Sequence, residues 1–223
     1  MQGRLLILTG VLALLASAQS QHVKSIALQP DAVEPINTIV KQASYKGRTA
    51  VQLLPPPGKE QSDEAMMAIL PATRFNDGII ELEVSGAPRA DATPDMRGFV
   101  GIAFRVQSKG DKYECVYIRP ANARSDDQLR RNHSLQYDSK PDYSWKRLRA
   151  EAPGVYETYT DLAVGEWTKL KIVVAGTKAQ IYVNGAPQPS LIVNDLKLGD
   201  APGAIALWSH TSTDGYFSNL TVN

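Results

Sequence analysis

Apolar and polar residues alternate with a period of two through most of the chain after its apolar N-terminus. Such alternation places successive side chains on opposite faces of a β-strand. The alternating segments are rich in β-branched and aromatic residues, and Gly, Pro, Asn or Asp separate them. We therefore expect strands at SIALQ (25–29), GRTAVQLL (47–54), MMAILP (66–71), GIIELEVSG (78–86), GFVGIAFRVQ (98–107), KYECVYIRP (112–120), WTKLKIVVAG (167–176), KAQIYVNG (178–185), SLIVNDL (190–196), GAIALWS (203–209) and GYFSNLTVN (215–223).

Many short strands without intervening helices fit few architectures. An all-β, two-sheet antiparallel sandwich of the jelly-roll kind fits best, because the chain shows no internal repeat that would indicate a propeller. Residues 31–46 are the exception to the strand pattern, and a short helical turn is expected within VEPINTIVKQASY.

The N-terminus has the layout of a secretory signal peptide. MQGRLLILTGVLALLASAQSQ holds one basic residue, an apolar run and then Ala16-Ser17-Ala18, which is typical of a cleavage site. The apolar run is too short for a comfortable membrane span, so no stable membrane anchor is expected. We predict a signal peptide at 1–18, cleavage near Ala18, a secreted or periplasmic product, and a single domain at 19–223.

Charge and cysteine content exclude some functions. The chain has 24 basic and 23 acidic residues and a net charge of +1, whereas nucleic-acid proteins bind largely by neutralising phosphates. Cys115 is the only cysteine, so no intrachain disulfide can form and a packed core must supply the stability.

One segment, at about 119–160, breaks the alternating pattern. Its part from Arg119 to Arg149 holds eight Lys or Arg residues, four Asp residues and one His, which is too polar for a core strand. Long loops without their own structure are usually functional or disordered, and the recurring aromatic residues here need something to pack against. We expect this charged insert to be an ordered cover over one edge of a sheet.

The order of the segments resembles the concanavalin A-like lectin/glucanase superfamily. Within it, the chain is most similar to the bacterial 3-keto-disaccharide hydrolase domain and to related laminin-G-like secreted domains. The similarity runs from about Gly47 to the C-terminus and is carried by FNDGIIELEV (75–84), GFVGIAFRV (98–106), YECVYIRP (113–120), GEWTKLKIVVAGTKAQIYVNG (165–185), GAIALWS (203–209) and YFSNLTV (216–222). The resemblance implies a carbohydrate ligand, bound on the concave sheet.

Glycosidases usually need two carboxyl groups. Glycoside hydrolase family 16, which shares this fold, carries them on one strand in a pattern like E-I-D-x-x-E. The corresponding strand here holds Glu114, but Val116 replaces the Asp, and Ile118 and Arg119 lie where the second Glu would be. The family 16 dyad is therefore broken.

The remaining candidates for chemistry are Glu114, His133 and Asp126. In the SKGD hairpin, positions that sum to 219 would pair and place Arg105 opposite Glu114 on one sheet face. This pair is either an exposed cross-strand ion pair or part of a ligand site. His133 is the only residue of the insert that titrates near neutral pH, which makes it the natural proton-transfer candidate, although an isolated surface His is often inert.

Sugar sites combine planar polar side chains with aromatic rings. Trp208 fits either a sugar platform or the core. The expected substrate-binding residues are Arg105, Arg119, Asn122, Arg130, Arg131, Gln136, Tyr137, Trp145 and Trp208.

Three functions stay open at this point. The first is a secreted carbohydrate-active domain that binds a saccharide on its concave sheet and cleaves glycosides or 3-keto-glycosides. The second is a non-catalytic, lectin-like binding module, and the third is an adhesion domain. No cofactor is expected, and His22, His133 and His210 lack zinc spacing. Structural calcium, which some relatives of the resembled superfamily hold, stays open, although no Asp-rich loop motif supports it.

Overall fold

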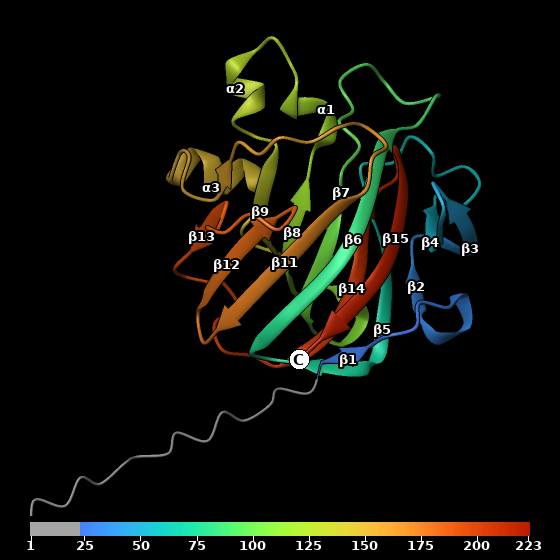
Figure 1. The fold of residues 1–223 in the computed structure, drawn as a ribbon, viewed down its shortest axis with the longest axis horizontal. Coiled ribbons are helices and arrows are strands. Elements are labelled where there is room, and N and C mark those ends of the chain that lie inside the picture. Colours follow the sequence, from blue (N-terminus) through green and yellow to red (C-terminus); the bar gives the residue numbers. More distant parts are fainter. Residues whose placement is uncertain (1–22) are drawn as a thin grey trace, which may run out of the picture.

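The computed structural model describes residues 23–223, so the expected signal peptide lies outside the described residues. Two antiparallel sheets pack face to face in this part of the chain (Figure 1). The all-β, two-sheet jelly-roll sandwich expected from the alternating pattern is confirmed.

We call the first sheet sheet A. Eight described strands form it, in the order β13 (Leu191–Val193), β12 (Lys178–Val183), β11 (Thr168–Ala175), β6 (Gly78–Pro88), β15 (Thr213–Val222), β4 (Arg48–Leu54) and β3 (Ile39–Tyr45), with β1 (Lys24–Ser25) also paired with β15.

We call the second sheet sheet B, and it carries the site described below. Seven described strands form it, in the order β10 (Glu157–Thr158), β9 (Leu135–Lys140), β8 (Tyr113–Ile118), β7 (Val100–Val106), β14 (Gly203–His210), β5 (Ala65–Phe75) and β2 (Glu34–Ile36).

The main core fills the space between the sheets. In sheet A, Ile80, Leu82 and Val84 of β6 are buried, while Glu81 and Glu83 alternate with them on the other face. Sheet B contributes every second residue in the same way, such as Ile102 of β7 and Val116 of β8. The period-two pattern of the sequence therefore arises because alternate residues of these strands pack between the two sheets.

Short helices lie at the edge of sheet B next to β8 and β9 (Figure 1). They are α1 (Pro120–Ala123), α2 (Gln128–Arg131) and α3 (Trp145–Glu151), and 3₁₀ turns occur at Pro30–Ala32 and Ser108–Gly110. No helix within residues 23–223 has the length and apolarity needed to cross a bilayer.

The expected helical turn at 31–46 is wrong for most of that segment. Only Pro30–Ala32 is a 3₁₀ turn, and the rest forms β2 and β3. β3 pairs along its whole length with β4 as an edge strand. An edge strand buries few side chains, so its sequence shows only weak alternation, and the partner strand decides its conformation.

The expectation that the charged insert contains no core strand is also wrong. β9, with the sequence LQYDSK, pairs with β8 and is buried over five of its six residues. Two of its polar side chains are satisfied there: Gln136 donates to the backbone oxygen of Tyr156 (3.0 Å), and Tyr137 donates to Glu114 of β8 (2.7 Å). The insert extends sheet B rather than only covering its edge.

The expected pairing of Arg105 with Glu114 is not observed. Phe104 is the residue opposite Glu114. Between Ala103 and Val106, β7 holds one residue more than β14 between their partners, and Arg105 adopts a left-handed φ of 52°. This bulge shifts the register by one residue and turns Arg105 into the interior.

Candidate functional site

A pocket of about 850 Å³ lies on the outer face of sheet B, the face directed away from sheet A. This volume falls within the range of roughly 300–1,000 Å³ usual for small-molecule sites. Its walls come from α1, α2, α3 and the β6–β7 loop, and its floor comes from β8, β9 and β14. It is lined by Asp63, Ala65, Asp95, Met96, Arg97, Phe99, Tyr113, Tyr117, Arg119, Asn122, Arg130, His133, Asp138, Lys140, Ser144, Trp145, Lys146, Arg149, Trp208 and His210.

Two stacked aromatic rings form part of the pocket floor. Tyr117 of β8 and Trp208 of β14 both pair with Gly101 of β7, one from each side. Their ring centroids are 4.8 Å apart at an interplanar angle of 29°. A Cβ on Gly101 would lie 2.1 Å from the carbonyl oxygen of Val116, so only glycine fits between these strands. The two rings thus stack above Gly101, which has no side chain to separate them.

Asp138 of β9 contributes a buried carboxyl group to the pocket. It lies opposite Cys115 of β8, and only 3% of its surface is exposed. Within residues 23–223, its Oδ1 has no hydrogen-bond partner. Burial raises the pKa of Asp138 to about 6, although Lys140 and Arg119 act in the opposite direction. A carboxyl group of this kind is a stronger base than an ordinary aspartate.

Arg119 follows β8 directly and is held by neutral acceptors. Nη1 donates to the backbone oxygen of His133 (3.0 Å) and to Oε1 of Gln136 (3.1 Å), and Nη2 donates to the hydroxyl of Tyr117 (3.0 Å). The guanidinium also lies 5.5 Å from the ring centroid of Trp145. Arg119 is 4% exposed, and no carboxylate among the described residues forms an ion pair with it. It is therefore a rigid, buried positive charge at the pocket wall.

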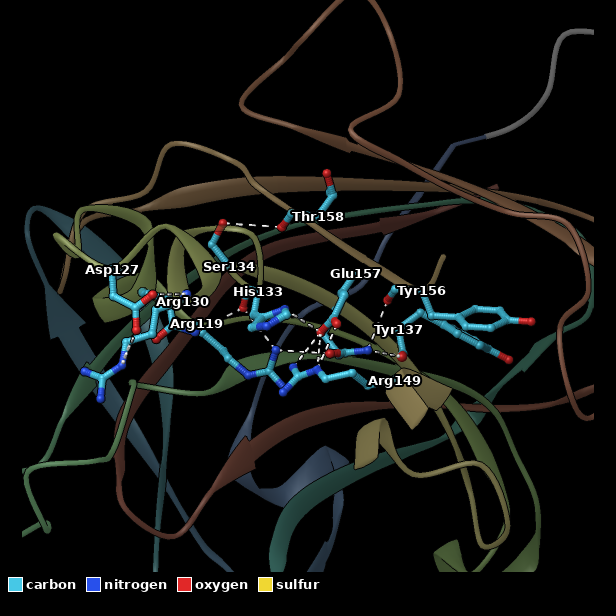
Figure 2. Close-up of polar contacts among 12 residues, drawn as sticks. Arg119, Asp127, Arg130, His133, Ser134, Tyr137, Arg149, Tyr156, Glu157 and Thr158 are labelled. Atoms are coloured by element: carbon cyan, nitrogen blue, oxygen red, sulfur yellow. Dashed lines mark hydrogen bonds and ion pairs between the residues drawn. The ribbon is translucent and has the colours of Figure 1, made fainter. Parts of the chain in front are cut away.

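His133, Glu157 and Arg149 form a cluster beside Arg119 (Figure 2). Arg149 holds the buried Glu157 with two nitrogens, at 2.8 Å from Nε to Oε1 and 2.6 Å from Nη2 to Oε2. Nδ1 of His133 lies 2.9 Å from Oε2 of Glu157, which is an ion-pair distance without the alignment of a hydrogen bond. Burial lowers the pKa of His133, and Arg149 and Arg119 lower it further against the effect of Glu157. His133 is thus neutral near pH 7.

Helix caps fix the segments that carry these side chains. The carboxylate of Asp127 accepts from the backbone N–H of Leu129 at 2.9 Å and caps α2, which carries Arg130. The hydroxyl of Ser144 caps α3, which carries Trp145 and Arg149. Asp and Ser are favoured at such positions because they satisfy free backbone N–H groups. Polar residues of the insert thus act as helix caps, and these caps fix the conformation of the pocket wall.

The family model described as the 3-keto-alpha-glucoside-1,2-lyase-like domain matches residues 37–223. The chain belongs to this family. The match confirms the resemblance seen in the sequence and includes every residue that lines the pocket.

Two solved structures illustrate the fold that this lyase-like domain shares with other proteins. The carbohydrate binding module CBM66 from Bacillus subtilis has a TM-score of 0.59 and 13% identity, and the match covers 86% of this chain and 96% of that chain. A protein of unknown function with a galectin-like fold, also from Bacillus subtilis, has a TM-score of 0.55 and 11% identity, with 87% and 90% covered. At these identities the likeness establishes the fold alone. None of the curated proteins compared with the sequence matches it.

The lyase-like domain brings half of the sequence-predicted site residues into one pocket. These are His133, Arg119, Asn122, Arg130, Trp145 and Trp208. Asn122 is buried, donates from Nδ2 to the backbone oxygen of His133, and keeps an Oδ1 without a partner among the described residues. Trp208 belongs to the pocket floor rather than to the core between the sheets.

Glu114 and Arg105 do not line the pocket. Glu114 faces the interior, where it accepts from the hydroxyl of Tyr137 (2.7 Å) and the backbone N–H of Leu198 (2.8 Å). Arg105 is fully buried at one end of the sandwich and donates to the carbonyl oxygens of Asn76 and Gly176. The expectation that both face a ligand is therefore wrong.

Four other candidates also lie outside the pocket lining. Tyr137 faces the core with Glu114, and Gln136 supports Arg119 from behind. Asp126 is exposed, and Arg131 contacts Tyr159, with its guanidinium 5.2 Å from the ring centroid.

Several pocket residues escaped the sequence reasoning. Asp138 was inside the insert, but nothing marked it as part of a buried strand. Tyr113 and Tyr117 were in an expected strand whose two faces are both apolar, so their direction was undetermined. Arg97 lies in the β6–β7 connection, whose course only the fold defines, and His210 ends β14, one residue beyond the expected strand at 203–209.

Metal ligands are not grouped in this site. Within residues 23–223, no group of three or more His, Cys, Asp or Glu side chains has an arrangement that could hold a metal ion.

Proposed function

We propose that the pocket on sheet B binds a saccharide and that the domain cleaves 3-keto-glycosides by elimination. The single observation that carries this proposal is the buried Asp138, whose carboxyl group has a raised pKa and an unpartnered oxygen in a pocket with an aromatic floor. Membership of the 3-keto-alpha-glucoside-1,2-lyase-like family supports the reaction class.

The lining suits a sugar in two ways. Tyr117, Trp208 and Phe99 offer apolar ring surfaces for the faces of a pyranose. Asn122 offers an unpartnered acceptor, and Arg119 and neutral His133 offer further polar groups for hydroxyls. Sites that combine apolar surface with a few fixed polar groups give orientation as well as affinity.

The proposed chemistry begins at the carbon next to the ketone. A ketone at C3 acidifies the C2–H bond, and the carboxylate of Asp138 takes that proton, so the bond electrons form an enolate. The positive charge of Arg119 stabilises the enolate oxygen. The ketone then re-forms, a double bond arises between C1 and C2, and the C1–O bond breaks with its electrons on the departing oxygen. Water supplies the proton of the released alcohol.

This route needs one carboxyl group and not two. Among the described residues, the carboxyl groups that line the pocket are Asp63, Asp95 and Asp138. Asp63 is exposed and lies 3.1 Å from His210, so it is not poised as the partner of Asp138. A hydrolysis that requires two facing carboxyl groups therefore has little support, in line with the broken family 16 dyad.

Binding without cleavage is the second candidate function. The same shortage of facing carboxyl groups favours it, and the similar CBM66 structure is described as a carbohydrate binding module. It predicts saccharide affinity without any product.

The test is to incubate the purified domain with glucosides and their 3-keto derivatives and to identify products by mass spectrometry, with thermal shift measured in the same samples. An unsaturated keto sugar and a free alcohol from the 3-keto substrate alone would support elimination. Thermal stabilisation without product would support the binding module, and neither effect with any sugar would overturn both candidates.

We also propose that the domain acts outside the cytoplasm after removal of residues 1–18, on the strength of the N-terminal sequence alone. Mass measurement of the protein from a secreting host tests this: a mature chain beginning near Gln19 is expected, and an intact Met1 with intracellular retention would contradict it.

A further inference from the structure

Positive charge is concentrated at the pocket although the chain as a whole is almost neutral. The net charge of the chain is +1. The residues that line the pocket, however, include six cationic and only three acidic side chains: Arg97, Arg119, Arg130, Lys140, Lys146 and Arg149 against Asp63, Asp95 and Asp138. Such clustering creates a local potential that favours an anionic ligand.

The cations of the pocket are only partly neutralised by the protein. Glu157 takes up the charge of Arg149, and the exposed Asp63 pairs with His210. In the described part of the chain, no carboxylate forms an ion pair with Arg97, Lys140 or Lys146. Unlike a surface charge run, these groups converge on one cavity.

The excess of positive charge is clearest at two arginines, Arg97 and Arg130. Arg97 comes from the β6–β7 loop, which is tied to α1 by a hydrogen bond from the backbone N–H of Ala121 to the carbonyl oxygen of Arg97. Arg130 comes from α2. Burial lowers the pKa of Arg97, and the proximity of Arg130 lowers it further, against the effect of the Asp95 carboxylate. Two guanidinium groups therefore repel each other across the pocket wall.

Both side chains keep donors for a ligand. Arg97 donates from Nη1 to the carbonyl oxygens of Pro94 and Met96, each at 2.9 Å, and its Nε and Nη2 have no partner within residues 23–223. The Nε of Arg130 lies 3.6 Å from Asp127 (Figure 2), a loose contact with a carboxylate that already caps α2. Guanidinium groups bind carboxylates and sulfates through two parallel hydrogen bonds.

We propose that the saccharide carries a negatively charged substituent, a carboxylate or a sulfate ester, and that Arg97 and Arg130 bind it. This inference rests on the proposed saccharide pocket and names the class of sugar that fits it. The bound anion relieves the repulsion between the two guanidinium groups. Arg119, deeper in the wall, stays available to the reacting part of the ligand.

The test compares sugars that differ only in charge. Isothermal titration calorimetry would measure binding of methyl glucoside, methyl glucuronide and methyl glucoside 6-sulfate to the wild-type domain. We expect one anionic sugar to bind at least about tenfold more tightly than the neutral one, with an advantage that shrinks at about 0.5 M NaCl. Which anionic sugar binds more tightly distinguishes the carboxylate from the sulfate.

Neighbouring arginines on α2 supply a matched control. Arg130→Gln and Arg97→Gln should each remove most of the preference for the anionic sugar, measured as the ratio of its affinity to that of the neutral sugar in the same variant. Arg131→Gln removes the same charge from the adjacent residue outside the pocket lining, and it should have no effect.

Equal affinity of the wild type for neutral and anionic sugars would overturn this inference and leave the saccharide pocket standing. An anionic preference that survives both pocket substitutions would also overturn the assignment to Arg97 and Arg130. Absence of binding by every sugar would instead count against the proposed function itself.

Discussion

Asp138 combines a buried position with an unpartnered oxygen, and its ionisation carries a cost in stability. The pKa of about 6 in the folded protein lies above the ordinary value of 3.8. The folded state therefore binds this proton more tightly than the unfolded chain. The resulting stabilisation is fully present below about pH 4 and is lost as the pH rises through 6.

Replacing Asp138 with Asn should remove this pH dependence. The shift of about two units corresponds to about 3 kcal/mol at most. We expect Asp138→Asn to be more stable than the wild type above pH 6 by up to that amount, with the difference shrinking towards pH 4. Urea unfolding of both proteins across this range measures it. A stability difference that does not change with pH would show that Asp138 is not held with a raised pKa.

At the scale of single residues, the sequence alone could not determine which face of β8 each side chain occupies. Tyr113, Cys115 and Tyr117 alternate on β8 with Glu114, Val116 and Ile118, and both sets are buried. The charged residue turned out to face the core, because the Tyr137 hydroxyl and the Leu198 N–H satisfy its carboxyl group there. Those partners come from distant parts of the sequence, so the choice of face was not readable locally.

Gly101 shows how a single position in β7 organises neighbouring strands. A Cβ there would lie 2.5 Å from the Cα of Tyr117 and closer still to a backbone oxygen of β8. Gly101→Ala should therefore force β8 away and destabilise the fold by about 2–3 kcal/mol. Thermal unfolding measures this cost. A variant as stable as the wild type would mean that β7 and β8 do not approach as closely as described.

Arg105 joins three turns at one end of the sandwich. Its guanidinium donates to the carbonyl oxygens of Asn76, Gly176 and Gly199, which belong to three separate connections. Arg105→Ala leaves these acceptors without a buried donor, and we expect a loss of about 3 kcal/mol or more.

The exposed Arg124, which pairs with Asp161, is the matched control for this loss. Arg124→Ala should change stability by no more than about 0.5 kcal/mol in the same urea titration. If Arg105→Ala instead keeps full stability and loses sugar affinity, Arg105 is a ligand residue, as the sequence alone predicts, and not a structural one.

The sequence predicted the strands whose burial alternates and those that are apolar along most of their length. Burial alternates along β6 and β11, β14 is largely apolar, and all three segments were recognised within one or two residues. β9 was missed because both of its faces are enclosed, one by the core and one by the pocket, so charged and apolar residues are mixed along it. The bulge at Arg105, whose φ is left-handed, was missed because a bulge produces no periodic pattern of apolar and polar residues in the sequence.

At the scale of the whole molecule, the sandwich acts as a scaffold with two different faces. One face of sheet B closes the core, and the other, together with the insert helices, forms the charged pocket. The order of the segments predicted this scaffold, and the mixture of polar and aromatic side chains pointed to six of the residues that line the pocket. The identity of the acid in the pocket depended on the path of the insert, which departs from any period in the sequence.

The central claim is that Asp138 carries the chemistry of this pocket. The most direct measurement is kcat/KM on a 3-keto-glucoside for the wild type, Asp138→Asn and Asp126→Asn, the last being an exposed Asp of the same insert outside the pocket lining. We expect a loss of about a hundredfold or more for Asp138→Asn with the fold intact, and wild-type turnover for Asp126→Asn. Full turnover by a folded Asp138→Asn variant would contradict it.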